Sequence, residues 1–123
     1  MSSPTETVLS FCAAWSRLDI EELLGYFTED AVYHNMPGAP AVGRAAVRRT
    51  IEHFLRGWRR TDWEVVATAA CGNVVFAERI DRTDTHSGKH VDLAVVGVFE
   101  VADGKIRAWR DYFDLASYTR AVA

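Results

Sequence analysis

The sequence predicts an α+β protein in which helices come first and long strands follow. In the N-terminal half, apolar residues recur at helical spacing, and from Trp63 onward β-forming residues alternate with polar ones. The turn signals Ser87-Gly88 and Asp103-Gly104 connect successive strands into antiparallel hairpins. We therefore expect a curved, mixed but mainly antiparallel sheet that forms a cone, with the N-terminal helices packed on its concave face.

Two capping signals begin the predicted helices. Ser3 and Glu6 form a capping box before a first helical pattern, and Asp19 with Glu22 repeats the signal before a short second helix that carries Phe27. The later predicted elements are, in order, an extended segment (31–35), a loop (37–40), a third helix (43–55), strands (63–70, 74–83, 91–101 and 106–113) and a terminal helix (115–122).

Length and composition exclude several classes of protein. The chain has 123 residues, 49% of them hydrophobic and 25% charged, which is typical of one globular domain spanning residues 1–123. Its net charge is -3 and no basic stripe runs along it, so nucleic acid is not an expected partner. No apolar run is long enough to cross a membrane, and the first residues lack a signal-peptide pattern, so we expect a cytoplasmic protein.

Charged residues interrupt the apolar face of one predicted strand. Side chains two positions apart share a face, so Val75, Ala77, Arg79 and Asp81 lie together on strand 74–83. The first two are core residues, and the strand therefore carries an arginine and a carboxylate into an apolar enclosure. A buried charge is costly unless it is paired, so these two side chains require partners.

Two other strands provide suitable partners. Asp111 lies between Trp109 and Phe113 on one face of the last strand, and Tyr33 shares a face with Asn35. The planar guanidinium of an arginine can pair with two carboxylates together. On spacing alone, the set is a structural ion-pair network, a group of residues that reach solvent where the alternation breaks, or a catalytic site, and these interpretations stay open.

Four sequence segments resemble those of limonene-1,2-epoxide hydrolases. They are Tyr33-His34-Asn35-Met36-Pro37, Glu78-Arg79-Ile80-Asp81, Gly97-Val98-Phe99-Glu100 followed by Asp103-Gly104-Lys105-Ile106, and Trp109-Arg110-Asp111-Tyr112-Phe113-Asp114. The likeness extends from about Thr5 to Tyr118. It departs from the family in a short N-terminal segment and in the loop 83–89. This family shares its cone-shaped fold with nuclear transport factor 2, ketosteroid isomerases and SnoaL-like polyketide cyclases, so the resemblance implies that fold.

The resemblance also implies a function and a set of site residues. It assigns Asp111 as the base on a water that Tyr33 and Asn35 also hold, Asp81 as the acid, and Arg79 as the bridge between the two aspartates. The implied reaction adds water in one step to a small lipophilic epoxide, cyclic or terpene-like, and gives a vicinal diol. The residues implied to line the substrate cavity are Leu93, Val95, Phe113 and Tyr118. By analogy with the family, a homodimer is expected.

Neither a cofactor nor a metal is expected. Glycine-rich phosphate loops are missing, and the four histidines do not form a metal-ligand pattern with cysteines or carboxylates. Two alternatives to the hydrolase remain. An isomerase or cyclase of the same fold needs one carboxylate base and a polar group for an oxyanion, whereas a non-catalytic ligand-binding module needs none of the buried charges.

Overall fold

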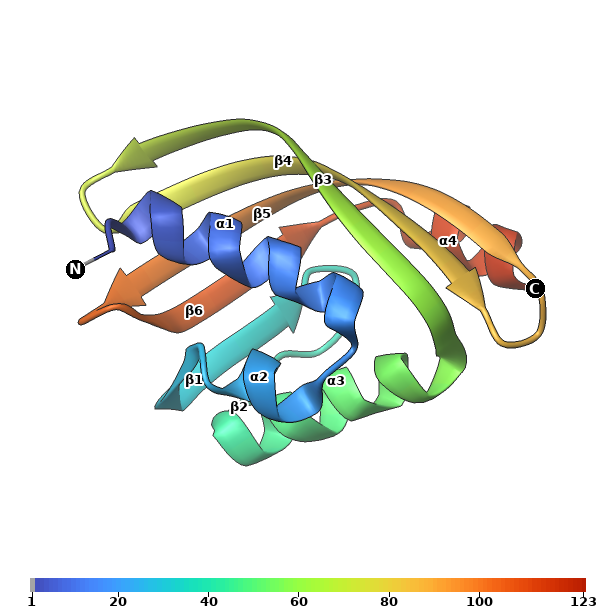
Figure 1. Cartoon of the computed structure of the whole chain (residues 1–123), viewed down its shortest axis with the longest axis horizontal. Helices are drawn as coiled ribbons and strands as arrows, with labels where there is room; N and C mark the ends of the chain where they lie inside the picture. The colour runs from blue at the N-terminus through green and yellow to red at the C-terminus, as the bar shows by residue number, and fades with distance from the viewer. Residues whose placement is uncertain (1) are drawn as a thin grey trace.

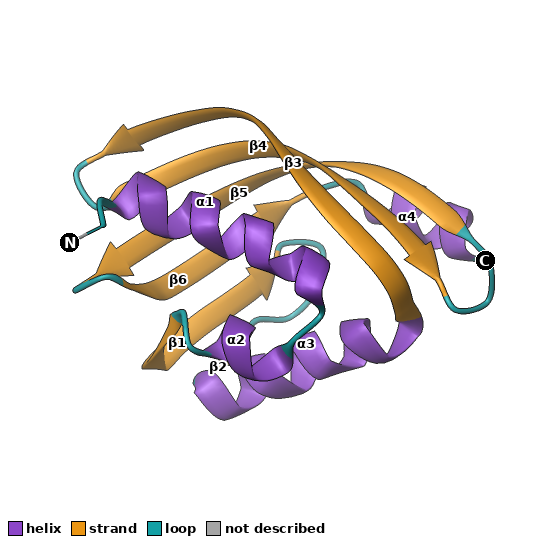
Figure 2. Cartoon of the chain, viewed as in Figure 1, coloured by secondary structure: helices purple, strands orange, loops and turns teal. Residues whose placement is uncertain are grey.

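One curved sheet organises the computed structural model, which describes residues 2–123 (Figure 1, Figure 2). Its strands lie in the order β2-β1-β6-β5-β4-β3. Only β1 and β6 pair in parallel, and every other neighbouring pair in this described sheet is antiparallel. The elements are α1 (Pro4–Ala14), a 3-10 turn η1 (Trp15–Arg17), α2 (Ile20–Leu24), β1 (Phe27–Asn35), β2 (Ala41–Val42), α3 (Arg44–Gly57), β3 (Trp58–Cys71), β4 (Val74–Thr85), β5 (His90–Ala102), β6 (Lys105–Tyr112) and α4 (Leu115–Val122).

The sheet bends around the N-terminal helices, as the sequence predicts. Figure 1 shows the long strands β3, β4 and β5 arching over α1, while α2 and α3 lie near β1. The terminal helix α4 lies at the other end of the sheet, next to β5. The predicted α+β class, the curved and mainly antiparallel sheet and the helices on its concave face are confirmed.

Both predicted capping signals are present at helix starts. The Ser3 hydroxyl accepts a hydrogen bond from the Glu6 backbone at 3.1 Å, and the Glu6 carboxylate accepts one from the Ser3 backbone at 3.1 Å. Asp19 accepts hydrogen bonds from the backbone of Glu21 and Glu22 at the start of α2. These contacts satisfy backbone N–H groups that the first helical turn leaves without partners.

Several boundaries differ from the prediction, most of all the starts of β1 and β3. Phe27 was expected in the second helix, but α2 ends at Leu24, Gly25 caps it, and Phe27 begins β1 opposite Ile106. Strand β3 begins at Trp58, five positions before the predicted Trp63. Its first residues are mainly polar and exposed, so the local pattern does not predict a strand there, although Thr61 and Trp63 are buried. In both cases the boundary is determined by pairing with a strand distant in sequence, and the local spacing of apolar residues does not predict such pairing.

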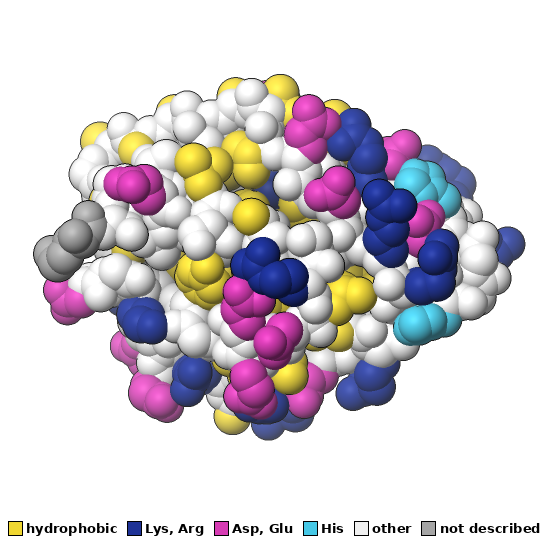
Figure 3. Space-filling model, viewed as in Figure 1, with side chains coloured by type: hydrophobic (Ala, Val, Ile, Leu, Met, Phe, Trp, Pro, Cys, Tyr) yellow, Lys and Arg dark blue, Asp and Glu magenta, His cyan; other side chains and the backbone are white. Residues whose placement is uncertain are grey.

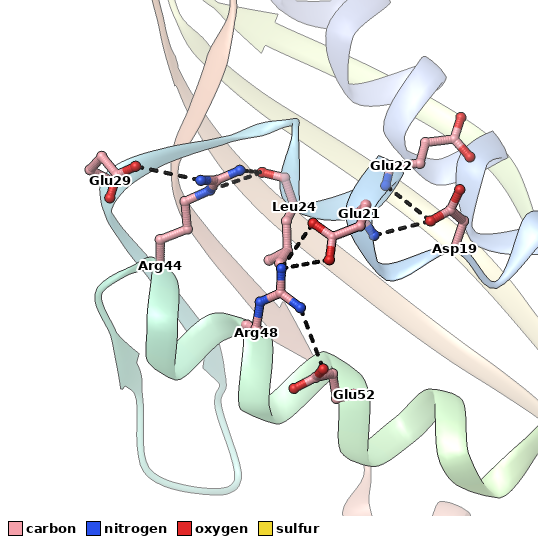
Figure 4. A network of polar contacts seen from close by, with 8 residues as sticks. All are labelled: Asp19, Glu21, Glu22, Leu24, Glu29, Arg44, Arg48 and Glu52. Atoms are coloured by element: carbon pink, nitrogen blue, oxygen red, sulfur yellow. Dashed lines mark hydrogen bonds and ion pairs between the residues drawn. The ribbon is translucent and has the colours of Figure 1, made fainter.

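An exposed ion network joins α2 to α3 (Figure 4). Arg48 on α3 donates to both carboxylate oxygens of Glu21 at 2.9 and 2.7 Å, and Arg44 donates to the backbone oxygen of Leu24 at 3.0 and 3.2 Å. Figure 3 shows basic side chains next to acidic ones on the face that carries these helices. Exposed pairs of this kind contribute little free energy of folding, so the two helices are held mainly by their apolar faces.

An aromatic core fills the space between α1 and the sheet. Trp109 on β6 is at its centre, and the ring centroids of Phe11, Trp15 and Phe99 lie 5.0, 5.9 and 5.5 Å from that of its indole. All four side chains are fully buried. This close aromatic packing supports the polar residues of the inner sheet face. Within residues 2–123, no helix is long and apolar enough to cross a membrane.

Candidate active site

Arg79 lies between two aspartates on the inner face of the sheet. Its Nε and Nη2 donate to the two carboxylate oxygens of Asp81 at 3.0 and 2.9 Å. Its Nη1 and Nη2 donate to the two carboxylate oxygens of Asp111 at 3.0 and 2.8 Å. The guanidinium therefore makes a forked contact with each carboxylate, which fixes the position of both relative to each other.

The three charged side chains are almost completely removed from solvent. Arg79, Asp81 and Asp111 are 1, 8 and 4% exposed. The guanidinium carbon of Arg79 also lies 4.3 Å from the centre of the Trp63 ring, so an aromatic face covers the cation. A buried network of this kind is weak evidence for stability, because desolvation offsets the attraction between the charges. It does hold its members in one geometry.

Strand register explains how Arg79 reaches a carboxylate two strands away. Arg79 is on β4 and Asp111 is on β6, with β5 between them. The residue of β5 that lies directly beside Asp111 is Gly97, which has no side chain to obstruct the path. A Cβ atom at Gly97 would lie 2.6 Å from Arg79 Nη1 and 2.8 Å from Asp111 Oδ1. The arginine therefore passes over β5 at its glycine.

The parallel pairing of β1 with β6 brings Tyr33 and Asn35 to the same place. Asn35 is the register partner of Asp111, and Tyr33 is that of Trp109. The Tyr33 ring stacks on the Trp109 indole with centroids 3.9 Å apart and planes 4° apart. Burial and the negative charge of Asp111 raise the pKa of Tyr33 well above its ordinary value, so the phenol keeps its proton.

The environment of Asp81 favours its protonated form. Burial raises the pKa of Asp81 to about 6, and the charge of Asp111 adds to this shift. The charge and hydrogen bonds of Arg79 act in the opposite direction and only partly offset burial. A carboxyl group that still carries a proton at mildly acidic pH can act as a general acid.

A small apolar cavity of about 200 Å³ opens above the two aspartates. Tyr33, Asn35, Asp81 and Asp111 all contribute to its polar end, while Arg79 is buried and does not line it. The residues that the resemblance assigned to the substrate cavity all line it: Leu93, Val95, Phe113 and Tyr118. The sequence interpretation missed further lining residues, namely Phe54, Trp58, Trp63 and Leu115. Larger depressions on the described surface are more open, and neither aspartate lines them.

Helix α4 closes one side of this cavity. Its Tyr118 hydroxyl accepts a hydrogen bond from Trp58 Nε1 at 3.2 Å. The same two aromatic rings and Phe54 also line a neighbouring open depression of about 460 Å³. This aromatic partition therefore limits the length of a ligand that the cavity can hold.

Two residues close to the aspartates were not assigned to the site from the sequence. Trp109, which the sequence places on the same strand face as Asp111, is buried and also donates its indole N–H to Asp111 Oδ1 at 2.6 Å. Gly97 received no role, although a glycine inside a long strand is a recognised sign of close approach by another group. That signal marks a position of close approach, but it does not say which group approaches.

The histidines and cysteines lie outside this site. No group of three or more His, Cys, Asp or Glu side chains within residues 2–123 is arranged to hold a metal ion. His90 bridges Asp84 and Asp92 on the exposed face of the β4–β5 hairpin, where the side chain of Asp92 is exposed. Asp114 is the N-cap residue of α4, and its carboxylate accepts a hydrogen bond from the Ser117 hydroxyl.

Comparison with known proteins gives the family. A family model described as a SnoaL-like domain matches residues 8–109, most of the chain. The chain belongs to the SnoaL-like family. Within it, this SnoaL-like protein is 34% identical over 110 residues to epoxide hydrolase EphG of Mycobacterium tuberculosis (strain ATCC 25618 / H37Rv), covering 88% of this chain and 71% of EphG. The resemblance to limonene-1,2-epoxide hydrolases that the sequence motifs indicated is confirmed.

Solved structures with the same architecture support this assignment. The SnoaL-like protein superimposes on an M. tuberculosis LEH-like epoxide hydrolase with a TM-score of 0.82 and 27% identity, over 96% of this chain and 87% of that one. An NTF2-like protein of unknown function from Burkholderia pseudomallei K96243 gives a TM-score of 0.87 at 21% identity, over 100% and 99%. At that lower identity, the second likeness establishes the fold alone.

Proposed function

We propose that this SnoaL-like protein, as one domain over residues 1–123, is an epoxide hydrolase that adds water to a small lipophilic epoxide in one step. The observation that carries the proposal is the pair of aspartates, bridged by one buried arginine, at the polar end of an apolar cavity. Opening an epoxide with water needs a base for the water and an acid for the leaving oxygen at the same time. Two carboxylates held in one geometry can supply both.

Asp111, Tyr33 and Asn35 hold and activate the water in this proposal. The three residues come from neighbouring positions of β1 and β6 and share the polar end of the cavity. Asp111 accepts a proton as the water oxygen attacks an epoxide carbon. The Tyr33 phenol, which stays protonated, and the Asn35 amide provide the other hydrogen bonds that orient the water.

Asp81 protonates the epoxide oxygen as the ring opens. Because its pKa is raised, the Asp81 carboxyl group can carry the proton that it donates. Arg79 holds the Asp81 side chain in place through two hydrogen bonds. After one turnover Asp111 carries a proton and Asp81 has lost one, so one proton must return to Asp81 before the next cycle. The two carboxyl groups are coupled through Arg79, so their titration belongs to the pair.

The cavity indicates the class of substrate. Its volume of about 200 Å³ is below the 300–1,000 Å³ or so of pockets for drug-sized ligands, and apart from the polar end its lining is aromatic and aliphatic. The wall residues Leu93, Val95, Phe113 and Tyr118 would contact the hydrocarbon part of the substrate. A small cyclic or terpene-like epoxide fits these properties, and water is the second substrate.

Incubation of the pure protein with cyclic and linear epoxides, followed by chiral analysis of the diols, tests the proposed activity. A single turnover in ¹⁸O-labelled water then tests the one-step route, which places the label in the diol and leaves both aspartates unlabelled. An enzyme carboxylate oxygen in the diol would instead indicate an ester intermediate. A folded protein that forms no diol with any epoxide of the panel would contradict the hydrolase proposal and favour the isomerase, cyclase or ligand-binding alternatives.

Two copies are proposed to pack through the outer face of the sheet, in the cytoplasm. Phe76, Val96 and Tyr112 are 45, 40 and 45% exposed on this face, and Val96 lies directly opposite Tyr112 in the β5–β6 ladder. Contiguous exposed apolar side chains of this kind mark interaction surfaces. Sedimentation should give a dimer that Val96→Lys dissociates and that Val42→Lys, on the edge strand β2, leaves intact. A monomeric parent protein would contradict this arrangement.

A further inference from the structure

The two aspartates differ in one hydrogen-bond donor. Arg79 donates two hydrogen bonds to each of them. Asp111 accepts a third, from Trp109 Nε1 to Oδ1 at 2.6 Å, whereas the side-chain donors to Asp81 within residues 2–123 all belong to Arg79. Arg79 therefore gives each carboxylate the same number of hydrogen bonds, and the indole adds one to Asp111 alone.

We propose that the indole N–H of Trp109 assigns the two roles, keeping Asp111 as the ionised base and leaving Asp81 to carry the proton. This inference rests on the proposed hydrolase function and adds a positioning residue to it. A donor directed at a carboxylate stabilises the charged form over the neutral one. Adding that donor to one member of a coupled pair moves the proton to the other member.

The indole is held rigidly enough to perform this task. Trp109 is fully buried and lies between Tyr33 and Phe99 in the register of the sheet. Its ring stacks on Tyr33 with planes 4° apart and on Phe99 with planes 14° apart, while Phe11 packs edge-on against it. The N–H therefore points at Asp111 without any rearrangement at the moment of reaction, which is the condition for effective electrostatic preorganisation.

The same contact selects which oxygen of Asp111 is the base. Oδ1 accepts hydrogen bonds from both Arg79 Nη1 and Trp109 Nε1. Oδ2 accepts one, from Arg79 Nη2 at 2.8 Å. Oδ2 therefore keeps the free lone pair that takes the proton of the water. Trp109 does not line the cavity, so it acts through Asp111 and does not touch the substrate.

Trp109→Phe is the direct test, because phenylalanine keeps a ring against Tyr33 and removes the N–H. A hydrogen bond to a charged group contributes enough for its loss to lower kcat about 10- to 100-fold and to move the acidic limb of the kcat–pH profile up by about 1–2 pH units. The KM should change less than about threefold, since no cavity wall changes. An unchanged acidic limb, or a loss confined to KM, would overturn the inference.

Trp15→Phe is the matched control. It removes the same atoms from a fully buried tryptophan whose ring centroid is 5.9 Å from that of Trp109, and its Nε1 has no hydrogen-bond partner within residues 2–123. This variant should lose thermal stability to a similar degree but keep the position of both pH limbs. Equal shifts of the acidic limb in the two variants would reduce Trp109 to a packing residue.

A measurement on the unsubstituted protein covers the case in which Trp109→Phe fails to fold. In ¹⁵N-labelled protein, the Trp109 indole N–H resonance should lie downfield and should move with pH as the Asp81–Asp111 pair titrates. The Trp15 indole resonance should not move in this range. A Trp109 resonance that does not respond to pH would contradict the inference without catalysis being involved, whereas absence of diol formation with a responsive resonance would contradict the hydrolase function alone.

Discussion

Adding one methyl group at Gly97 should disable the site although no charged residue is replaced. Gly97 lies on β5 between Ala77 of β4 and Asp111 of β6, directly under the contact between Arg79 and Asp111. The Cβ atom of an alanine would be 2.6 Å from Arg79 Nη1, 2.8 Å from Asp111 Oδ1 and 2.8 Å from a ring carbon of Phe99. Gly97→Ala therefore crowds both ends of one hydrogen bond and the aromatic core beside it.

The required displacement can be worked from these distances. Ordinary contact begins at 3.4 Å, so Nη1 must retreat by about 0.8 Å and Oδ1 by about 0.6 Å. The Nη1–Oδ1 hydrogen bond is 3.0 Å long, and the guanidinium is also held by Asp81, so no single rotation relieves both contacts. A misplacement near 1 Å in a catalytic group costs on the order of 10²-fold in rate. Overpacking should also lower the free energy of unfolding by about 1–3 kcal/mol.

Diol formation and thermal unfolding of the same preparations check this prediction. Gly57→Ala is the control, because a Cβ atom there has no other atom within 4 Å and the backbone is not left-handed. The control should keep its activity and its melting temperature, while Gly97→Ala should lose both. A Gly97→Ala protein with near-normal kcat would refute the idea that Arg79 must pass over β5 at this position.

Three further outcomes are expected. Asp111→Asn, which removes the base with little change in shape, should lower kcat by about 10²–10⁴-fold in single-turnover assays, and near-normal turnover would remove Asp111 from its role. In the parent enzyme, kcat/KM should fall as pH rises through about 6, because the raised pKa of Asp81 means that its proton is present below that pH and lost above it; a flat profile from pH 5 to 9 would contradict this. Tyr118→Ala removes the partition between the cavity of about 200 Å³ and the depression of about 460 Å³. Competition assays should then show that kcat/KM for long epoxides rises on the order of 10-fold relative to that for short ones. An unchanged ratio would exclude Tyr118 as the barrier.

The sequence predicts the fold well where one period persists over a whole element. Alternation on β4 and β6 correctly puts Arg79 and Asp81 on one face, and Asp111 on the inward face of its own strand. It fails at the start of β3, where Arg59 and Arg60 conceal a strand that is stabilised by pairing with the far end of β4. Such pairing is a long-range property, and a local pattern of side chains contains little information about it.

The composition of the site was predictable in part for the same reason. Alternation explains why Arg79 needs partners, but not that β1 pairs in parallel with β6 and so places Asn35 beside Asp111. The family motifs supplied that link. The roles of Trp109 and Gly97 depend on the direction of one N–H group and on one missing side chain, and these become apparent only when the three strands are assembled.

In the proposed mechanism, burial accounts for the division of the two carboxyl groups into one acid and one base. Arg79 contributes one positive charge, and two ionised aspartates would leave the enclosed unit with one excess negative charge. Desolvation makes that excess costly, and one proton on either carboxyl group removes it. The raised pKa of Asp81 reflects this cost, and in our proposal the third hydrogen bond to Asp111 determines which carboxyl group receives the proton. In the proposed hydrolase, an apolar enclosure around an Asp–Arg–Asp unit therefore favours a neutral acid next to a charged base, which is the pair of groups that epoxide opening needs.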